Sequence, residues 1–275
     1  MARRDITIGV ALGAGSARGW AHIGVLKALT ESGIVPHVVC GTSIGALVGA
    51  VYAGGELDAL EQWVKGLTWR KMVGYFDLTF GGGIIKGSKL FDYLRGNLLD
   101  KRIEDLERPF AAVAADLANG REVWLRSGAV ADAVRASIAL PGLFTPWPLE
   151  GRLLVDGALV NPVPVSLARA LNADFVIAVD LSSGILGHQA RDGGDGQRGA
   201  RQPGFIDVVT ASLNIMSARI SRSRLAGEPA DAVILPRLGN LGLLEYHRAA
   251  EAIAAGRAAA ENMVVQIRQS LDDFG

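Results

Sequence analysis

Residues 41–45 carry the clearest chemical signal in the sequence, because GTSIG is a G-x-S-x-G motif centred on Ser43. The apolar stretch Val35–Cys40 before it predicts a buried strand, and the small residues Ala46–Ala53 after it predict a helix. A sharp turn from strand to helix exposes a serine hydroxyl, and flanking glycines tolerate the crowding. The alternative is an ordinary glycine-rich turn in which Ser43 caps the helix. The motif in this context favours a nucleophile.

A second signal is the small-residue segment Gly13–Gly19, between the predicted strand Ile6–Leu12 and the predicted helix Trp20–Ser32. Its backbone N–H groups can form a cradle for an anion at the start of the helix. Such a cradle can hold the oxyanion of a tetrahedral acyl intermediate or the pyrophosphate of a dinucleotide. The dinucleotide fingerprint requires a glycine where this chain has Arg18, and an acidic residue where the second strand ends at Cys40. These two absences disfavour the dinucleotide site.

The third signal is Asp156, which follows the short predicted strand Leu153–Val155 and precedes Gly157 and Ala158. A carboxylate held beside small neighbours can approach Ser43 closely, and a buried aspartate can accept the serine proton in place of histidine. Alone, the tripeptide fits an aspartate in a β-turn equally well. Together with the other two signals it becomes informative, and it makes Asp156 a candidate base.

A histidine base is the main alternative, and the chain contains four histidines: His22, His37, His188 and His247. In the chain order of α/β-hydrolases the histidine follows the acid, which leaves His188 and His247. No motif surrounds either residue, so a structural role is expected for all four.

In order and rough spacing, the three segments resemble the three signatures of the patatin-like phospholipase family. Three longer stretches agree with the family as well: Arg18–Leu26, Arg135–Pro141 and Leu154–Pro164. The last stretch is similar to bacterial members related to neuropathy target esterase. The resemblance covers roughly residues 5–182, about two-thirds of the chain.

The resemblance implies a three-layer α/β/α sandwich with a mainly parallel central sheet, in one hydrolase domain spanning residues 1–275. It also implies a dyad of Ser43 and Asp156 without a histidine base. The motif residues around this dyad are Gly41, Gly45, Gly157 and Ala158.

In this comparison, backbone amides of the first glycine turn form the oxyanion hole. The candidate donors are Gly13, Ala14, Gly15, Ser16 and Arg18. The family pattern places glycines at positions 14 and 16, where this chain has alanine and serine. Backbone N–H groups survive such changes, so the hole is expected to persist.

The resemblance further implies hydrolysis of a carboxylic ester through an acyl-enzyme formed on Ser43. The implied substrate is a lipid or lysophospholipid ester, and no metal or organic cofactor is implied. One alternative is a nucleotide-binding oxidoreductase, which Arg18 weakens. Another is a regulatory lipid-binding module that keeps the fold and has little turnover.

Composition limits the remaining possibilities. The 275 residues are 49% hydrophobic, enough for the core of one large α/β domain. The formal net charge is zero and a basic stripe is missing, so nucleic acid is not an expected partner. The single cysteine, Cys40, excludes an internal disulfide, is expected in the core, and fits the reducing cytoplasm. The oligomeric state stays open.

No apolar run in the sequence approaches the length of a membrane span, so lipid would have to be met through peripheral apolar contact. The aromatic-rich stretch 63–93 has two interpretations, a lid at a lipid surface or a buried core segment. Its aromatic residues are Trp63, Trp69, Tyr75, Phe76, Phe80, Phe91 and Tyr93. Within it, Gly82–Lys89 resembles a P-loop only superficially, because its serine and lysine are in the wrong order.

The rest of the chain alternates predicted strands and helices, as expected of an α/β domain. Further strands are predicted over Ala111–Ala114, Glu122–Leu125, Phe175–Asp180 and Ala232–Leu235, the first two as a hairpin. Further helices are predicted over Ala129–Ala139, Val165–Leu171, Asp207–Ser221 and Arg248–Leu271. Residues 184–204, which are rich in glycine and arginine, predict a mobile surface loop within the domain.

Overall fold

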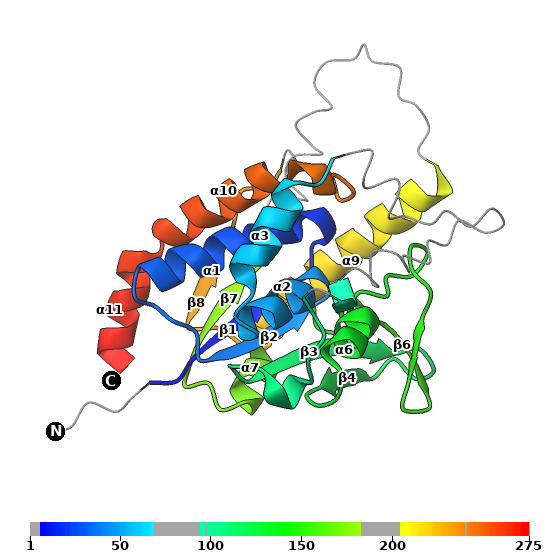
Figure 1. Ribbon diagram of the computed structural model, residues 1–275, viewed down its shortest axis with the longest axis horizontal. Coiled ribbons are helices and arrows are strands. Elements are labelled where there is room, and N and C mark those ends of the chain that lie inside the picture. The colour runs from blue at the N-terminus through cyan, green and yellow to red at the C-terminus, as the bar shows by residue number, and fades with distance from the viewer. Residues whose placement is uncertain (1–5, 69–93, 97, 183–203, 240, 275) are drawn as a thin grey trace, which may run out of the picture.

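The computed structural model describes residues 6–68, 94–96, 98–182, 204–239 and 241–274, with backbone alone at 205–207 and 210. His188, residues 184–203 of the predicted loop and residues 69–93 of the aromatic stretch lie outside the described residues. In the described part, helices flank one central sheet on both sides (Figure 1). The first and last described segments of the chain lie at the same end of the molecule (Figure 1).

Eight strands of the described residues form this sheet, in the order β5-β6-β3-β2-β1-β7-β8, with β4 paired to β3. The strands are β1 (Ile8–Leu12), β2 (Val38–Thr42), β3 (Phe110–Asp116), β4 (Glu122–Leu125), β5 (Trp147–Leu149), β6 (Arg152–Asp156), β7 (Phe175–Val179) and β8 (Ala232–Ile234). Pairing is parallel from β8 through β7, β1 and β2 to β3. Pairing is antiparallel among β3, β4, β6 and β5. The mainly parallel sheet and the β3–β4 hairpin confirm the prediction.

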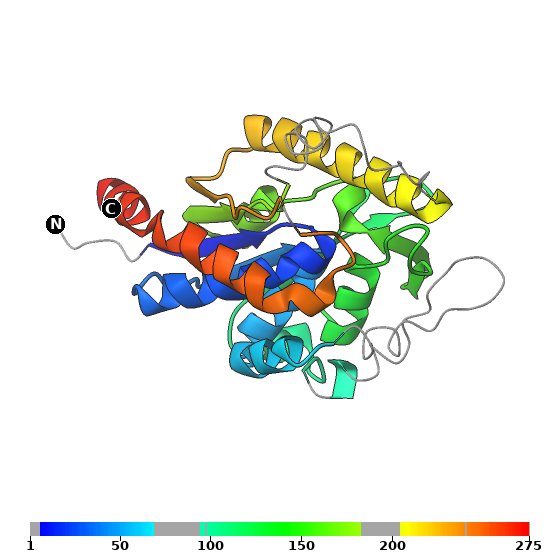
Figure 2. The same ribbon diagram turned by 90° about the horizontal axis from the view of Figure 1, so that it is seen from above.

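Helices cover both faces of the sheet. They are α1 (Ala21–Glu31), α2 (Ile44–Ala53), α3 (Leu57–Lys65), α6 (Val130–Ser137), α7 (Val165–Ala170), α9 (Phe205–Gly227), α10 (Ala249–Glu261) and α11 (Val264–Phe274). Short 3-10 turns are η1 (Ser16–Trp20), η2 (Ile103–Asp105), η3 (Gly157–Leu159) and η5 (Tyr246–Arg248). Seen from above, α7 and α9 lie on one side of the sheet, and α1, α3 and α10 on the other (Figure 2).

The strands at the centre of the sheet are apolar on both faces. In β1, Val10 and Leu12 belong to the larger hydrophobic cluster, whereas Ala11 belongs to a second cluster with α7. The same alternation separates Ile177 from Ala178 in β7. Parallel strands covered by helices on both faces have this pattern, because successive side chains point to opposite sides. The three-layer α/β/α sandwich is confirmed.

Several predicted boundaries are wrong. Strand β2 continues to Thr42 and α2 begins at Ile44, so the turn predicted over five residues shrinks to Ser43 alone. The single helix predicted over Arg248–Leu271 is divided into α10 and α11, since Asn262 ends α10 and the chain turns so that Ile267 reaches the core. Helix α3 and strand β5 were not predicted. Strand β5 has only three residues, and one of them is a proline.

None of the helices in the described residues is both long enough and apolar enough to cross a lipid bilayer.

Candidate active site

Strand β3 brings the ends of β2 and β6 together. Val113 of β3 pairs with Thr42 of β2, and the next residue, Ala114, pairs with Asp156 of β6. Both residues of β3 also pair with β4, so β2 and β6 must share the opposite edge of β3. Because β2 is parallel to β3 and β6 is antiparallel, their carboxyl ends meet head-on. This register places the residue after Thr42, which is Ser43, beside Asp156.

The two predicted catalytic side chains are in direct contact. The Ser43 hydroxyl donates a hydrogen bond of 2.6 Å to Oδ2 of Asp156. The other carboxylate oxygen, Oδ1, accepts a bond of 2.9 Å from the Ala158 amide. Asp156 is buried, with 1% of its surface exposed, and Ser43 is 9% exposed. The site therefore joins a nearly buried serine hydroxyl to a buried carboxylate whose orientation the backbone fixes.

The described histidines lie elsewhere. His22 is buried and its Nε2 shares a hydrogen bond of 2.7 Å with the Gly13 carbonyl. His37 accepts a bond of 3.0 Å from the Ile8 amide at Nδ1. His247 is exposed on η5. Among the residues that the structure describes, no histidine is hydrogen-bonded to the serine or the aspartate of the pair.

The backbone of Ser43 is held in an uncommon conformation, with φ 57° and ψ −124°. Such a conformation costs free energy and persists only where the surroundings impose it. The Ser43 amide donates 2.9 Å to the hydroxyl of Ser137 on α6, and this hydroxyl donates 2.6 Å to the Val113 carbonyl. Ser137 therefore ties the strained turn to β3, a role that the sequence analysis missed.

The glycines that flank Ser43 are required by close backbone approach. A Cβ atom at Gly45 would lie 2.2 Å from the Leu12 carbonyl oxygen, at the end of β1. A Cβ atom at Gly41 would lie 2.3 Å from the carbonyl oxygen of Gly45. Neither position can hold a side chain without moving backbone, so the motif glycines allow α2 to start directly over the sheet.

Burial controls the charge of the carboxylate. Desolvation raises the pKa of Asp156 from 3.8 to about 6, while the hydrogen bonds from Ser43 and Ala158 oppose the rise. At neutral pH the carboxylate is thus mainly ionised, with a proton affinity well above that of an exposed aspartate. A carboxylate with these properties is suited to accept the proton of a bonded hydroxyl.

The first glycine turn lies beside the pair, and its amides divide into two groups. Gly13 donates 3.0 Å to the Val179 carbonyl, and Ala14 donates 2.9 Å to the Pro162 carbonyl. The Arg18 amide donates 3.2 Å to the Gly15 carbonyl. Three of the five expected oxyanion donors are thus already engaged within the fold.

The remaining two expected donors are the amides of Gly15 and Ser16. No acceptor in the described part of the chain is hydrogen-bonded to either of them. Both residues line the same pocket as Ser43 and Asp156. Of the five expected donors, these two N–H groups are therefore available to a ligand in that pocket.

The pocket above the pair has mostly apolar walls. Apolar residues that line it include Trp20, Leu47, Trp63, Leu67, Ile138, Leu143, Phe144, Val163 and Leu213. Trp63 is the one aromatic residue of the predicted stretch 63–93 that the structure describes. Its ring lies edge-on to Trp20, with 6.4 Å between centroids. Among the described lining residues, none is lysine, arginine or histidine. The pocket therefore combines a polar end with a surface suited to an acyl chain.

In the part of the chain that the structure describes, no three His, Cys, Asp or Glu side chains are grouped so that they could hold a metal ion.

Comparisons with known proteins agree with this arrangement. Residues 10–169 match the model of the family described as patatin-like phospholipase. An uncharacterised NTE family protein of Mycobacterium tuberculosis is 32% identical over 324 residues, covering 92% of this chain and 90% of that protein. The chain belongs to the patatin-like phospholipase family. The resemblance drawn from the three motifs is thus confirmed, and family membership implies lipid acyl hydrolase activity.

Other family members are larger proteins. Patatin-like phospholipase domain-containing protein 6 of Homo sapiens is 37% identical over 185 residues, which cover 64% of this chain and 13% of that protein. The crystal structure of VipD from Legionella pneumophila aligns with a TM-score of 0.50 at 13% identity, covering 97% of this chain and 66% of that one. This structural likeness supports the patatin-like fold.

Two further polar residues of this family member line the pocket and were missed in the sequence. Asp180 follows β7, and its carboxylate accepts bonds from the amide and hydroxyl of Ser182 and from the Ser221 hydroxyl. Its position at the carboxyl end of a parallel strand is the signal that could have identified it. Tyr246 shares a hydrogen bond of 2.7 Å with the Ser16 hydroxyl. No motif surrounds Tyr246, so only the fold reveals it.

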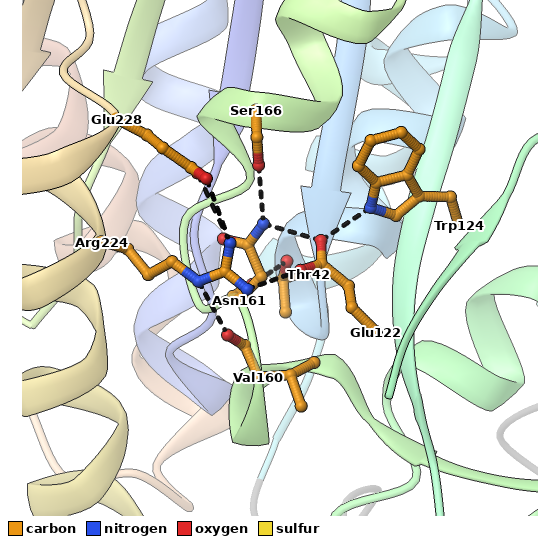
Figure 3. A network of polar contacts seen from close by, with 8 residues as sticks. All are labelled: Thr42, Glu122, Trp124, Val160, Asn161, Ser166, Arg224 and Glu228. Carbon is orange, nitrogen blue, oxygen red and sulfur yellow. Dashed lines mark hydrogen bonds and ion pairs between the residues drawn. The ribbon is translucent and has the colours of Figure 1, made fainter. Parts of the chain in front are cut away.

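A polar network supports the turn at Ser43 from the side of α7 and α9 (Figure 3). Thr42 donates 2.8 Å from its hydroxyl to the carbonyl of Asn161, a fully buried residue shortly after η3. The side-chain amide of Asn161 donates a hydrogen bond of 2.8 Å to Glu122 of β4. Glu122 also accepts a charge-assisted hydrogen bond of 2.7 Å from Arg224 of α9. Because Thr42 directly precedes Ser43, the network connects α9 and the β3–β4 hairpin to the backbone that carries Ser43.

Proposed function

We propose that this patatin-like phospholipase is a carboxylic ester hydrolase of acyl lipids, with Ser43 as nucleophile and Asp156 as general base. The observation that carries the proposal is the 2.6 Å hydrogen bond between these side chains at the polar end of an apolar pocket. A serine bonded to a base of raised proton affinity, beside two available amides, has the parts that acyl transfer needs.

In the first half of the reaction, Asp156 accepts the hydroxyl proton as Ser43 Oγ forms a bond to the ester carbonyl carbon. The carbonyl electron pair moves onto its oxygen, and the amides of Gly15 and Ser16 donate to that oxyanion. The tetrahedral intermediate then collapses and the bond to the alcohol oxygen breaks. Asp156 returns its proton to the departing alcohol, which leaves an acyl ester on Ser43.

In the second half, water takes the place of the alcohol. Asp156 accepts a proton from water as the water oxygen attacks the acyl carbon, and the same amides hold the second oxyanion. The Ser43–acyl bond breaks, Ser43 Oγ regains the proton, and the fatty acid is released. Every proton transfer uses Asp156, so the proposal requires no cofactor.

The substrate class follows from the pocket walls. An acyl chain gains free energy by leaving water for the apolar surface around Leu47, Ile138 and Phe144. The described lining presents the carboxylates of Asp156 and Asp180, and none of its residues is a cationic side chain. We therefore assign the acyl chain, and not a phosphate group, to this pocket, as in a phospholipid or lysophospholipid ester.

Contact with the lipid surface is assigned to α9. Helix α9 contributes Leu213 and Ser217 to the pocket, while Val208, Ile215 and Met216 are 48%, 41% and 51% exposed. Exposed apolar side chains on a helix that borders the pocket suit peripheral contact with a membrane or micelle. The protein would act as one domain in the cytoplasm and meet its substrate at that surface.

The deciding experiment combines turnover of a p-nitrophenyl acyl ester with labelling by a fluorophosphonate. Wild-type protein should hydrolyse the ester and become labelled, because an activated serine displaces fluoride from phosphorus. Ser43→Ala should lose both, whereas Ser127→Ala, at an exposed serine in the loop after β4, should lose neither. Unlabelled, inactive wild-type protein with a normal melting curve would instead indicate a lipid-binding module without turnover.

A further inference from the structure

The turn that holds the Gly15 and Ser16 amides is attached to a segment more than 220 residues away in the sequence. The Ala17 amide donates 3.0 Å to the Leu243 carbonyl, and Arg18 Nε donates 2.8 Å to the Leu241 carbonyl. Two more bonds connect the turn to Tyr246. This C-terminal segment lies outside residues 10–169, where the family model matches.

Tyr246 holds the turn at both of its ends. Its hydroxyl shares a 2.7 Å hydrogen bond with the Ser16 hydroxyl, and its carbonyl accepts 3.2 Å from Nε1 of Trp20. The Tyr246 ring also lies edge-on to the Trp20 ring, with 6.0 Å between centroids. Since η1 runs from Ser16 to Trp20, one residue fixes the first and last positions of this turn.

Ser16 needs this support because its backbone is in the left-handed region, with φ 51°. A residue with a Cβ adopts that region at a cost, and it persists only where the surroundings impose it. The hydrogen bond to Tyr246 acts on the side chain of the strained residue itself. The direction of the Ser16 amide, a proposed oxyanion donor, depends on the same backbone.

The support for Tyr246 is itself rigid. Tyr246 begins η5, which leads directly into α10, and α10 lies against α1 with backbones in contact. A Cβ atom at Gly256 of α10 would be 1.9 Å from the Ala21 carbonyl oxygen, and one at Gly24 of α1 would be 1.9 Å from the Ile253 carbonyl oxygen. Two helices with backbones this close cannot slide past each other. The position of Tyr246 relative to the turn is therefore fixed.

The protonation state of Tyr246 agrees with such a role. Burial and the nearby Asp156 raise the pKa of the phenol, while the bond to Ser16 opposes the rise. The phenol therefore keeps its proton at neutral pH and can donate to the Ser16 oxygen.

We propose that Tyr246 is a positioning residue for the oxyanion hole, acting through its hydroxyl on Ser16. This inference rests on the proposed hydrolase function. It means that the chain beyond the family match completes the active site. The interaction should matter most in the transition state, when charge develops on the carbonyl oxygen.

The test is Tyr246→Phe, which removes the hydroxyl and keeps the ring contact with Trp20. The kcat for a p-nitrophenyl acyl ester should fall about tenfold with little change in KM, since a misdirected donor costs less than a deleted one. Ser16→Ala should cause a similar loss, and the double variant should lose no more than either single variant. Tyr52→Phe is the matched control, because that hydroxyl contacts Thr30 and not the pocket.

The rate of fluorophosphonate labelling gives a second measurement, because the tetrahedral phosphorus uses the same oxyanion donors. Tyr246→Phe should slow labelling by a similar factor at an unchanged melting temperature. An active wild type with unchanged kcat in Tyr246→Phe, or losses that multiply in the double variant, would overturn this inference alone. Wild-type protein that neither turns over ester nor labels would overturn the proposed function, and this inference with it.

Discussion

Two turns of the molecule start helices at neighbouring strands, yet they are held in different ways. The turn at Ser43 is held from close by, through the motif glycines, the edge of β3 and the Ser137 hydroxyl. The turn at Ser16 is held by Leu241, Leu243 and Tyr246 from the far end of the chain. Both contain a non-glycine residue with positive φ. A strained turn can thus be recognised from local sequence only when its support is local too.

The largest effect should come from removing the carboxylate that is bonded to Ser43 of the first turn. Asp156→Asn keeps the shape and removes the proton acceptor, so kcat/KM for a p-nitrophenyl ester should fall by about 10²-fold or more. His247→Ala should cost little, because His247 is exposed and does not line the pocket of Ser43 and Asp156. A loss in His247→Ala equal to that in Asp156→Asn would contradict the dyad and favour a Ser-His-Asp triad.

The next largest effect should come from distorting the second turn. A Cβ atom at Gly15 would lie 2.7 Å from Cδ1 and 3.0 Å from Cβ of Leu181, so Gly15→Val must displace Leu181, the turn or both. Loss of an oxyanion donor raises the barrier by about 3 kcal/mol, and kcat should fall by about 10²-fold with a smaller change in KM. Gly227→Val is the control, since nothing lies near its Cβ position. A raised KM with unchanged kcat would mark the turn as a substrate-binding loop.

A smaller effect is expected at Ser137, which supports the first turn without touching substrate. Ser137→Ala leaves the buried Ser43 amide without its acceptor, which should lower the free energy of unfolding by about 1–3 kcal/mol. Because the turn also relaxes, kcat should fall roughly tenfold. Calorimetry and steady-state kinetics measure the two effects, and a lowered melting temperature with wild-type kcat would limit Ser137 to a role in stability.

The smallest effect is the pH dependence that burial of Asp156 imposes. The base must be ionised, and its pKa is about 6, so kcat/KM should decline about tenfold per unit below pH 6 and level off above it. Asp156→Asn should remove this dependence from its residual activity. A wild-type profile that stays flat down to pH 4.5 would argue against Asp156 as the base.

The same shift has a consequence for stability. The folded pKa of Asp156 lies above the ordinary value of 3.8, so the folded state holds more protons than the unfolded state between about pH 4 and pH 6. The contribution of this group therefore falls as pH rises through that window and stays unfavourable above it. The melting temperature of Asp156→Asn relative to wild type should rise from pH 4 to pH 7, and a constant difference would contradict this account.

The sequence by itself predicted the fold class and the family, and it singled out Ser43 and Asp156 as the candidate catalytic pair. Each depends on a local pattern, such as strand, glycine, serine and helix in immediate succession, which backbone sterics make recognisable. It also indicated the segment of the first glycine turn, but not which of its amides are available. The carbonyls of Val179 and Pro162 that engage Gly13 and Ala14 come from distant strands and loops.

Only the tertiary structure decided which residues meet. Ser43 and Asp156 are 113 positions apart, and they touch because β2 and β6 end at adjacent residues, Val113 and Ala114, on one edge of β3. Strand register depends on pairing across the whole sheet, which no local window of sequence contains. Tyr246 is the extreme case, since the packing of α10 on α1 brings it to Ser16 from 230 positions away.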